Sequence, residues 1–264
     1  GYAIPPKFYP ADFINEGVDQ TRGWFFTLHA IATMVFDSVA FKNVISSGLV
    51  LDAKGNKMSK HVGNVVNPFD MIHKYGADAV RFYMMTNSEP WDNLKFDANG
   101  VDEVRRKLFG TLYNTYSFFA LYANVDNFDL ETPQVDFAKR PEIDRWILSC
   151  LQTLIKKVDA ELKSYDPTRA GRLIDNFVND DLSNTYVRQS RKRFWGKEMS
   201  EDKLSAYQTL HTCLLTVAKL LAPFAPFYSD QLYHDLGGEM TSVHLENFPQ
   251  ANEAFINTDL EERM

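Results

Sequence analysis

The sequence predicts an α/β layer followed by an all-α bundle, and the change between the two falls near residue 100. Before that point, short apolar runs are separated by glycines and alternate with helical patterns, an order that favours a parallel sheet with covering helices. After it, apolar residues recur with the period of amphipathic helices over long segments joined by short polar links, which is typical of a helical bundle.

The first part contains two expected strands, over residues 8–14 and 43–51, with an expected helix over residues 21–36 between them. Polar turns follow both strands, at residues 15–17 and at residues 52–56, and the second turn contains a glycine suited to a positive φ. Strand, helix and strand in this order indicate one repeat of a parallel α/β layer.

Helices account for the rest of the expected structure. Pro68 fits the first turn of a helix that continues to Tyr75 and that Gly76 ends, and residues 77–85 form another short helix. One long helix is expected over residues 101–123. The other three long helices carry the following apolar stripes: Ile147, Leu148, Leu151, Leu154, Ile155, Val158 and Leu162; Leu173, Ile174, Phe177, Val178 and Leu182; Leu210, Leu214, Val217, Leu220 and Leu221.

The composition excludes several classes of protein. With 264 residues and a formal net charge of -7, the chain is not a generally basic nucleic-acid binder, so any contact with nucleic acid requires a local basic patch. Neither Cys150 nor Cys213 belongs to a CxxC pair, so we expect no disulfide framework, no protein-bound metal and a reduced cytosolic setting. No apolar run approaches the roughly 18 residues of a membrane span, and no secretory signal opens the chain.

The most informative string is Lys57-Met58-Ser59-Lys60-His61, which follows an expected strand and a glycine turn. Two ammonium groups three residues apart, with a small hydroxyl between them, can surround a polyphosphate, because the flexible lysine stem follows charge as it develops. For an arbitrary pair of lysines, a solvated basic loop is the ordinary alternative. Four residues that match a known signature, in this strand-turn context, reverse that judgement in favour of a phosphate site.

A second string, Glu16-Gly17-Val18-Asp19-Gln20-Thr21-Arg22-Gly23-Trp24-Phe25, follows the first expected strand. Its spacing to the lysine string is what half of a Rossmann-type layer needs to bring both strings to the carboxyl edge of the sheet. The string is also compatible with a simple helix start, since acidic groups favour that position. For Trp24, burial without ligand contact is the alternative to a binding role.

A third string, from Asp180 to Trp195, lies in the helical part. At 100° per residue, its basic and aromatic members Arg188, Arg191, Lys192 and Trp195 share one helical face. Cations pair with phosphates and rings stack on bases, so this face suits RNA. A cationic helix end that complements its own dipole is an equal alternative from the residues alone.

The lysine string resembles the KMSK signature of class I aminoacyl-tRNA synthetases, which normally ends in serine where this chain has His61. Both lysines are in place. The resemblance continues through Gly48-Leu49-Val50-Leu51 before the string, and through Gly63-Asn64, Asn67-Pro68 and Tyr75-Gly76-Ala77-Asp78-Ala79-Val80-Arg81 after it.

The string at residues 16–25 resembles the isoleucine-specific members of this family more than the valine- or leucine-specific ones. The resemblance implies that Lys57 and Lys60 are catalytic, that Asp19 binds ribose hydroxyls and that Trp24 forms a wall of the amino-acid pocket. The implied ATP contacts are Met58, Ser59, Lys60 and Asp19. The implied contacts of the aminoacyl-adenylate are Glu16, Gly17, Asp19, Gln20 and Trp24.

The helical part resembles the anticodon-binding domain of the same family, through the third string and through residues 144–148 and 222–227. The string departs from the family pattern at Thr185, where tryptophan is usual, so the packing of this helix is expected to differ. The resemblance implies that tRNA is bound by Arg188, Arg191, Lys192, Arg193 and Trp195.

These resemblances predict the second half of a Rossmann-type catalytic domain over residues 1–62, a stem-contact or linker segment over residues 63–99, and a helical anticodon-binding domain over residues 100–264. The HxGH signature and the editing insertion of the family are not found, and the chain starts at Gly1 and stops within a helical pattern. We therefore expect a part cut from a longer protein that does not aminoacylate by itself.

The expected partners are isoleucine, ATP with Mg²⁺ as a substrate, and tRNA(Ile), with no membrane association, in a cytoplasmic monomer. Three alternatives remain open from the sequence. The chain could belong to a synthetase for valine, leucine or methionine, form a non-catalytic tRNA-binding module, or be a helical interaction protein without an RNA role.

Overall fold

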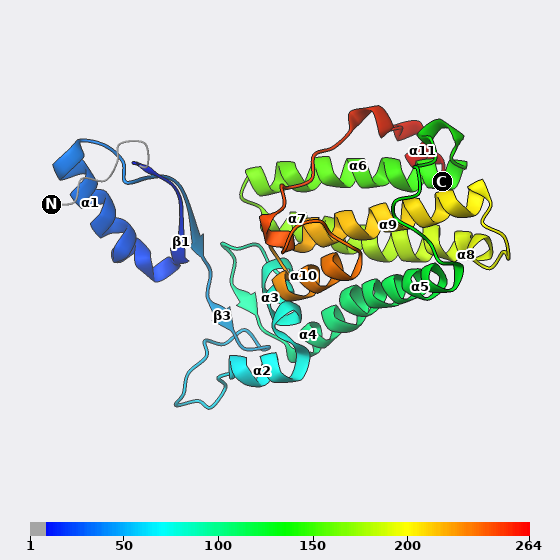
Figure 1. Cartoon of the computed structure of the whole chain (residues 1–264). Coiled ribbons are helices and arrows are strands. Elements are labelled where there is room, and N and C mark those ends of the chain that lie inside the picture. The colour runs from blue at the N-terminus through cyan, green and yellow to red at the C-terminus, as the bar shows by residue number, and fades with distance from the viewer. Residues whose placement is uncertain (1–8) are drawn as a thin grey trace. The chain divides into compact units, whose positions relative to one another are not determined.

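The computed structural model describes residues 9–264 and divides the chain into two compact units (Figure 1). The N-terminal unit comprises residues up to 67 together with residues 87–97, and the C-terminal unit comprises residues 68–86 and 98–264. The first contains parallel strands joined through a helix and the second is helical, as the sequence predicts. Phe8, the first residue of the predicted strand 8–14, lies outside the described residues.

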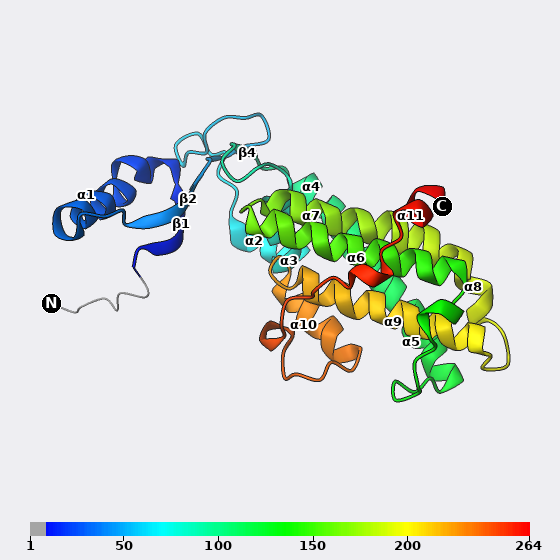
Figure 2. The same ribbon diagram turned by 90° about the horizontal axis from the view of Figure 1, so that it is seen from above.

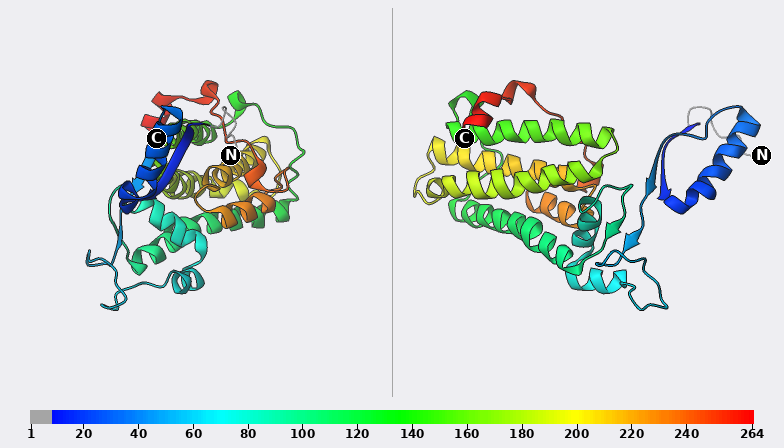
Figure 3. Two further views of the ribbon diagram at one scale, coloured as in Figure 1. Left: turned by 90° about the vertical axis from the view of Figure 1, so that its left-hand side faces the viewer. Right: turned by 180° about the vertical axis from the view of Figure 1, so that it is seen from behind.

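The N-terminal unit is built on one β-α-β repeat. Strand β1 (Ala11–Gly17) leads through a 3-10 turn (Val18–Arg22) into helix α1 (Trp24–Phe36), and β2 (Phe41–Ser47) returns parallel to β1. Helix α1 lies alongside the two strands (Figure 3). Phe25 on α1 contacts Phe41 at the start of β2, with 6.2 Å between the ring centroids.

The ends of these strands differ from the prediction. The predicted turn at residues 15–17 is still part of β1, because Asn15, Glu16 and Gly17 pair with Ile45, Ser46 and Ser47 of β2. The Asn15 side chain also stabilises this end of β1, since its Nδ2 donates to the Ile45 carbonyl at 3.1 Å.

The predicted strand 43–51 is divided at Gly48 into β2 and a short strand β3 (Val50–Leu51). The backbone of Gly48 passes so close to Asp92 that an added Cβ would lie 2.1 Å from the Asp92 carbonyl oxygen. Beyond this contact, β3 leaves β2 and pairs parallel with β4 (Leu94–Lys95). A glycine is therefore required where the chain changes partners.

The C-terminal unit is a bundle in which α6, α7 and α9 run lengthwise beside one another (Figure 2). Its four long helical segments confirm the prediction from the apolar stripes. The elements are α2 (Pro68–Tyr75), α3 (Ala77–Thr86), α4 (Ala98–Val104), a π-helix (Arg105–Phe109), α5 (Gly110–Asp126), a 3-10 turn (Phe137–Lys139), α6 (Glu142–Lys163), α7 (Pro167–Asn176), a second π-helix (Phe177–Val187), α8 (Arg188–Phe194), α9 (Glu201–Leu221), α10 (Pro226–Asp235), 3-10 turns (Val243–Leu245 and Glu253–Phe255) and α11 (Thr258–Arg263).

The apolar stripes of these helices form the core of the bundle. Side chains such as Ile147, Leu151, Ile174, Leu210 and Leu214 have no exposed surface. Burying a side chain of this size contributes about 1.5 to 3 kcal/mol, so the stripes supply the main driving force for the bundle. The bundle thereby becomes a rigid support for the exposed groups on its surface.

Helix α3 is fastened into this bundle, which is why residues 68–86 belong to the C-terminal unit. The guanidinium of Arg81 donates to the carbonyl oxygens of Pro223 and Phe224, both at 3.3 Å. The carboxylate of Asp78 accepts from the Tyr228 N–H at 2.6 Å, at the start of α10. The predicted segment 63–99 is therefore divided between the two compact units: residues 68–86 and 98–99 belong to the C-terminal unit and the others to the N-terminal unit.

Helices α7 and α8 are joined without a break by the π-helix of residues 177–187, so all three form one continuous helical rod. Thr185, which departs from the family pattern, lies in this wide segment, and its hydroxyl donates to the Asp180 carbonyl five residues earlier at 2.8 Å. Threonine, which is smaller than the tryptophan usual at this position, thus forms a hydrogen bond within the π-helix itself.

Both cysteines are free, and burial raises the pKa of the Cys150 thiol to about 12, so it stays protonated. In the described part of the chain, no helix is both long and apolar enough to cross a membrane.

Candidate functional site

The carboxyl end of β1 gathers the acidic residues predicted to hold an adenylate. Glu16 and Gly17 are the last residues of the strand, and Asp19 and Gln20 follow in the 3-10 turn. The Gly17 N–H donates to the Glu16 carboxylate at 3.2 Å, and an added Cβ on Gly17 would lie 2.8 Å from the Asp19 carboxylate and displace it. Glu16 and Asp19 are exposed, so their carboxylates can receive donors from a ligand.

Gln20 connects this acidic group to the start of α1. Its Nε2 donates to the Asp19 carboxylate at 3.1 Å, and its Oε1 accepts from the Trp24 N–H at 3.0 Å. The side chain thus caps the first turn of α1, which begins at Trp24 and not at the predicted Thr21. Trp24 is 43% exposed, which argues against its being a core residue.

The lysine loop, which we define as residues 52–64, follows β3 and starts with a tight turn. The Asp52 carboxylate accepts from the N–H groups of Lys54 and Asn56 at 3.0 and 2.8 Å, and Gly55 takes the predicted positive φ of 86°. Leu51 and Lys57 form an antiparallel bridge that closes this turn. The hydrogen bonds from Asn64 and Asn56, together with those from the backbone, hold the pKa of Asp52 below its usual range.

Lys57 and Lys60 are both exposed, whereas Met58 and Ser59 between them are half-buried. Neither ammonium group forms an ion pair within the described residues. The loop therefore presents two uncompensated positive charges, which is the arrangement a polyphosphate requires.

The acidic group at the end of β1 and the lysine loop remain separate clusters in residues 9–264, since no hydrogen bond or ion pair joins the residues predicted for one to those predicted for the other. The sequence prediction missed Asn64 as a member of the second cluster. In the sequence, Asn64 was marked only by its place in the segment after the lysines that resembles the family.

The basic face of the bundle, which we define as Arg188, Arg191, Lys192 and Trp195, lies on α8 and its C-terminal end. All four residues are exposed, and the Trp195 side chain is 55% exposed. The three cations make no ion pair with any described residue. Three free charges beside an exposed indole match what RNA phosphates and bases bind.

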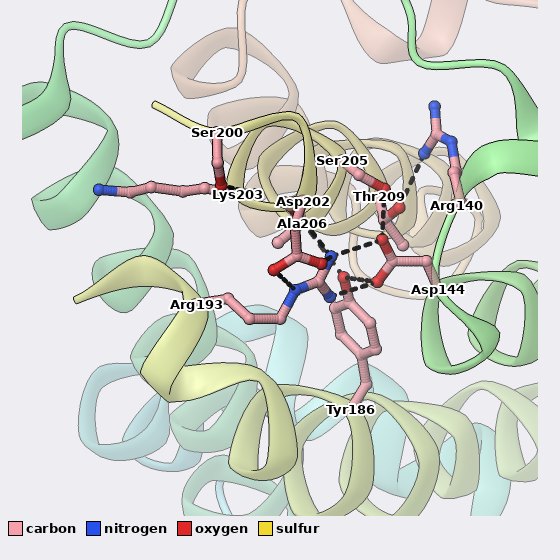
Figure 4. Close-up of polar contacts among 10 residues, drawn as sticks. All are labelled: Arg140, Asp144, Tyr186, Arg193, Ser200, Asp202, Lys203, Ser205, Ala206 and Thr209. Atoms are coloured by element: carbon pink, nitrogen blue, oxygen red, sulfur yellow. Dashed lines mark hydrogen bonds and ion pairs between the residues drawn. The ribbon is translucent and has the colours of Figure 1, made fainter. Parts of the chain in front are cut away.

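Arg193, which was predicted to contact tRNA with these residues, is instead turned into the bundle (Figure 4). Its side chain is 14% exposed, and its guanidinium donates to both oxygens of Asp144 at 2.6 and 2.9 Å. It also pairs with Asp202 at 3.0 Å. The prediction that Arg193 faces RNA is corrected, because its donors are used within the protein.

Asp144 is the centre of this cluster and has no exposed surface. Besides the guanidinium, its carboxylate accepts from the hydroxyls of Tyr186 at 2.8 Å and Ser205 at 2.5 Å (Figure 4). Four hydrogen bonds therefore replace the water that the carboxylate loses on folding. The cluster ties α6, α8, α9 and the π-helix together.

Asp181, on the same π-helix, has an unusual titration. Burial raises its pKa from 3.8 to about 6, and the neighbouring carboxylates of Asp180 and Glu261 add to the rise. The folded protein thus binds a proton more tightly than the unfolded chain does. This contribution to stability is complete below pH 4 and is lost as the pH rises through about 6.

We therefore expect Asp181→Asn to stabilise the protein at pH 7 by about 1 to 2 kcal/mol, less than the full shift would give because the side chain is partly exposed. The variant should also lose the fall in stability between pH 4 and 6. Urea unfolding at several pH values measures both effects, with the exposed Glu198→Gln as the control. Stability curves that stay parallel for Asp181→Asn and the unmodified chain would contradict the assignment.

The two segments that hold these clusters match two models of known families. Residues 5–97 match the model described as tRNA synthetases class I (I, L, M and V). Residues 144–264 match the model described as the anticodon-binding domain of tRNA ligase. Together, the two matches assign the α/β unit and the helical bundle to the class I tRNA synthetases.

The most similar relatives narrow the class. The chain is 67% identical to isoleucine–tRNA ligase of Bacteroides thetaiotaomicron over 263 residues, which cover 98% of this chain and 23% of that protein. It is 66% identical to the enzyme of Porphyromonas gingivalis, with 97% and 22% covered, and 53% identical to that of Deinococcus radiodurans, with 92% and 22% covered. The chain belongs to the isoleucine–tRNA ligases, and it spans about a quarter of the length of these relatives.

Two solved structures share the fold. The LeuRS of Agrobacterium radiobacter K84, in a ternary complex with tRNA and LeuAMS, superposes with a TM-score of 0.73 at 22% identity and covers 95% of this chain and 30% of that one. The methionyl-tRNA synthetase of Mycobacterium tuberculosis, in complex with methionyl-adenylate, gives 0.68 at 22% identity and covers 85% and 44%. At this identity the likeness concerns the fold alone.

Proposed function

We propose that this chain is the part of an isoleucine–tRNA ligase that contains the lysine loop and the anticodon-binding bundle. The whole ligase activates isoleucine with ATP and Mg²⁺ as substrates and transfers it to tRNA(Ile), as a monomer in the cytosol. The observation that carries the proposal is the loop with two exposed and unpaired lysines in a chain 67% identical to isoleucine–tRNA ligase.

In the first reaction, an isoleucine carboxylate oxygen attacks the α-phosphorus of ATP, and the bond from that phosphorus to the pyrophosphate oxygen breaks. Negative charge grows on the departing pyrophosphate as this bond lengthens. Lys57 and Lys60 are free to follow that charge, and they accelerate the step insofar as they bind the transition state more tightly than ATP. Met58 and Ser59, which lie half-buried between the two lysines, are the further ATP contacts of this proposal.

The end of β1 positions the other part of the substrate. The exposed carboxylates of Glu16 and Asp19 accept hydrogen bonds from the adenylate, including those of its ribose hydroxyls. The Gly17 N–H donates to Glu16 and the Gln20 amide donates to Asp19, and the exposed ring of Trp24 forms a wall of the isoleucine pocket. These groups contribute mainly by fixing the reacting atoms relative to one another.

The basic face of the bundle supplies contacts to tRNA(Ile). Neutralising its three cations by Arg188→Gln, Arg191→Gln and Lys192→Gln together should weaken tRNA binding about tenfold and lower the salt dependence of binding by a slope of about 2. Titrations at several salt concentrations measure both effects. The matched control neutralises Lys139, Lys157 and Lys163, which removes the same charge elsewhere on the bundle. Equal losses in the two triple variants would show that only net charge matters.

Isoleucine-dependent ATP–pyrophosphate exchange tests the proposed function, on this chain alone and on the whole ligase that contains it. We expect exchange only by the whole ligase, with isoleucine preferred over valine, leucine and methionine. A preference for another amino acid would leave the class in place and overturn the isoleucine assignment. Exchange by this chain alone would show that the other parts of the ligase are not required for activation.

A further inference from the structure

The lysine loop is held at its base by two side chains that lie twelve residues apart, Asp52 and Asn64. Asn64 Nδ2 donates to the Asp52 carboxylate at 2.9 Å, and this contact joins the two arms of the loop. Both side chains are only half-exposed, so the contact is partly shielded from water. Lys57 and Lys60 lie between the two joined residues.

Asn64 also contacts the backbone of the segment that contains the lysines. Its Oδ1 accepts from the Ser59 N–H at 2.8 Å, and its Nδ2 donates a second hydrogen bond to the Lys57 carbonyl at 3.2 Å. The amide side chain therefore fixes the residue before and the residue after Met58. Only one orientation of the amide satisfies all three contacts, because one side offers an N–H donor and the other offers two acceptors.

On the other arm, Asp52 fixes the turn that leads into the loop. One of its carboxylate oxygens accepts from the backbone of Lys54 and Asn56, while the other accepts from Asn64. A single carboxylate thus connects the glycine turn to the far arm of the loop. The conformation of the lysine segment is set from both sides by this pair.

We propose that Asn64 is a positioning residue for isoleucine activation and that it acts through a clamp with Asp52. The clamp holds the backbone at Lys57 and Ser59 so that both ammonium groups meet the pyrophosphate as its charge grows. This inference rests on the proposed function, which assigns the two lysines their substrate. In this proposal Asn64 acts through the backbone of the loop and not by contact with the substrate.

The hydrogen-bond pattern of the clamp supplies a specific test. In Asn64→Asp, a carboxylate faces both the Asp52 carboxylate and the Lys57 carbonyl, so two donors are replaced by repulsive contacts. Adding Asp52→Asn restores a donor between the two side chains and removes one of the two like charges. The double variant should therefore work better than Asn64→Asp alone, which a loss of general stability would not produce.

Limited proteolysis with trypsin tests the clamp in this chain without requiring isoleucine activation, because trypsin cleaves after lysine in segments that open. We expect Asn64→Ala and Asn64→Asp to raise the rate of cleavage after Lys57 and Lys60 on the order of tenfold, while cleavage after Lys139 in the bundle stays unchanged. The double variant should return toward the original rate. Unchanged cleavage after Lys57 and Lys60 would overturn the clamp.

Activation kinetics of the whole ligase measure the positioning role. We expect Asn64→Asp to lower kcat of pyrophosphate exchange about 10- to 100-fold with a smaller change in the KM for ATP, since displaced lysines lose contacts made mainly in the transition state. The double variant should recover most of this loss. Faster cleavage with an unchanged kcat would overturn the positioning role.

The failure of this inference can be distinguished from the failure of the proposed function. If the whole ligase activates another amino acid, kcat is measured with that amino acid, and the same pattern of loss and recovery supports the clamp. If the double variant loses as much as the two single variants combined, Asn64 and Asp52 act independently and the clamp is overturned, whichever amino acid is used.

Discussion

Lys60→Ala is expected to slow isoleucine activation by the whole ligase on the order of 100- to 1000-fold. The ammonium group is exposed and unpaired in the loop, so its removal leaves no buried partner and little effect on folding is expected. Its loss removes a charge that meets the pyrophosphate while the bond to the α-phosphorus breaks. The rate of ATP–pyrophosphate exchange at saturating ATP and isoleucine measures the effect.

Lys54→Ala is the matched control for this experiment. Lys54 is exposed in the same loop, and it contributes to the turn at Asp52 through its backbone N–H, which alanine keeps. We expect it to retain nearly the full exchange rate. A normal rate in Lys60→Ala would remove the lysine loop from the mechanism, and an equal loss in Lys54→Ala would reduce its role to a general attraction for ATP.

Arg193→Met is expected to lower the free energy of unfolding by about 3 to 5 kcal/mol. The substitution leaves Asp144, which has no exposed surface, without the guanidinium that donates to both of its oxygens. The remaining hydroxyls of Tyr186 and Ser205 do not replace the lost charge. Urea unfolding of this chain, followed by circular dichroism, measures the change.

Arg191→Met is the control two residues away on the same helix. Arg191 is exposed and has no ion pair among the described residues, so its effect on stability should stay within about 0.5 kcal/mol. The two variants should behave in the opposite way toward tRNA, because Arg191→Met loses affinity while folded Arg193→Met does not. A stable Arg193→Met that binds tRNA poorly would reverse the two assignments.

The bundle could be predicted from the sequence because three of its four long helices carry an apolar stripe, and such a stripe is a local property. The division of the strand at Gly48 could not be predicted in this way. It depends on residues more than forty positions further on. The Gly48 N–H donates to the Pro90 carbonyl, the Leu49 N–H donates to Asn93 Oδ1, and the backbone of Asp92 lies against Gly48. Strand ends depend on such distant partners, which the hydrophobic periodicity of the sequence does not reveal.

The candidate sites divide along the same line. The lysine loop and the end of β1 were predicted from short strings, and the charged residues Glu16, Asp19, Lys57 and Lys60 are exposed in the structure. Arg193 was assigned to the wrong environment because its partner, Asp144, lies 49 residues earlier, on another helix. A basic string shows where cations are, but only the packing of α9 against α8 and the contact of Arg193 with Asp144 of α6 show which cation is used internally.

The π-helix of residues 177–187 sets the direction of everything that follows it on the rod. A π-helix turns the chain by less than the 100° per residue of an α-helix, because each of its turns holds more residues. Closing the wide segment to α-helical geometry at the same length would therefore turn α8 to another direction around the rod. Arg193 would then leave Asp144, and the exposed cations would point elsewhere. The wide turns thus set the angle between α7, which packs into the core, and the exposed cations of α8.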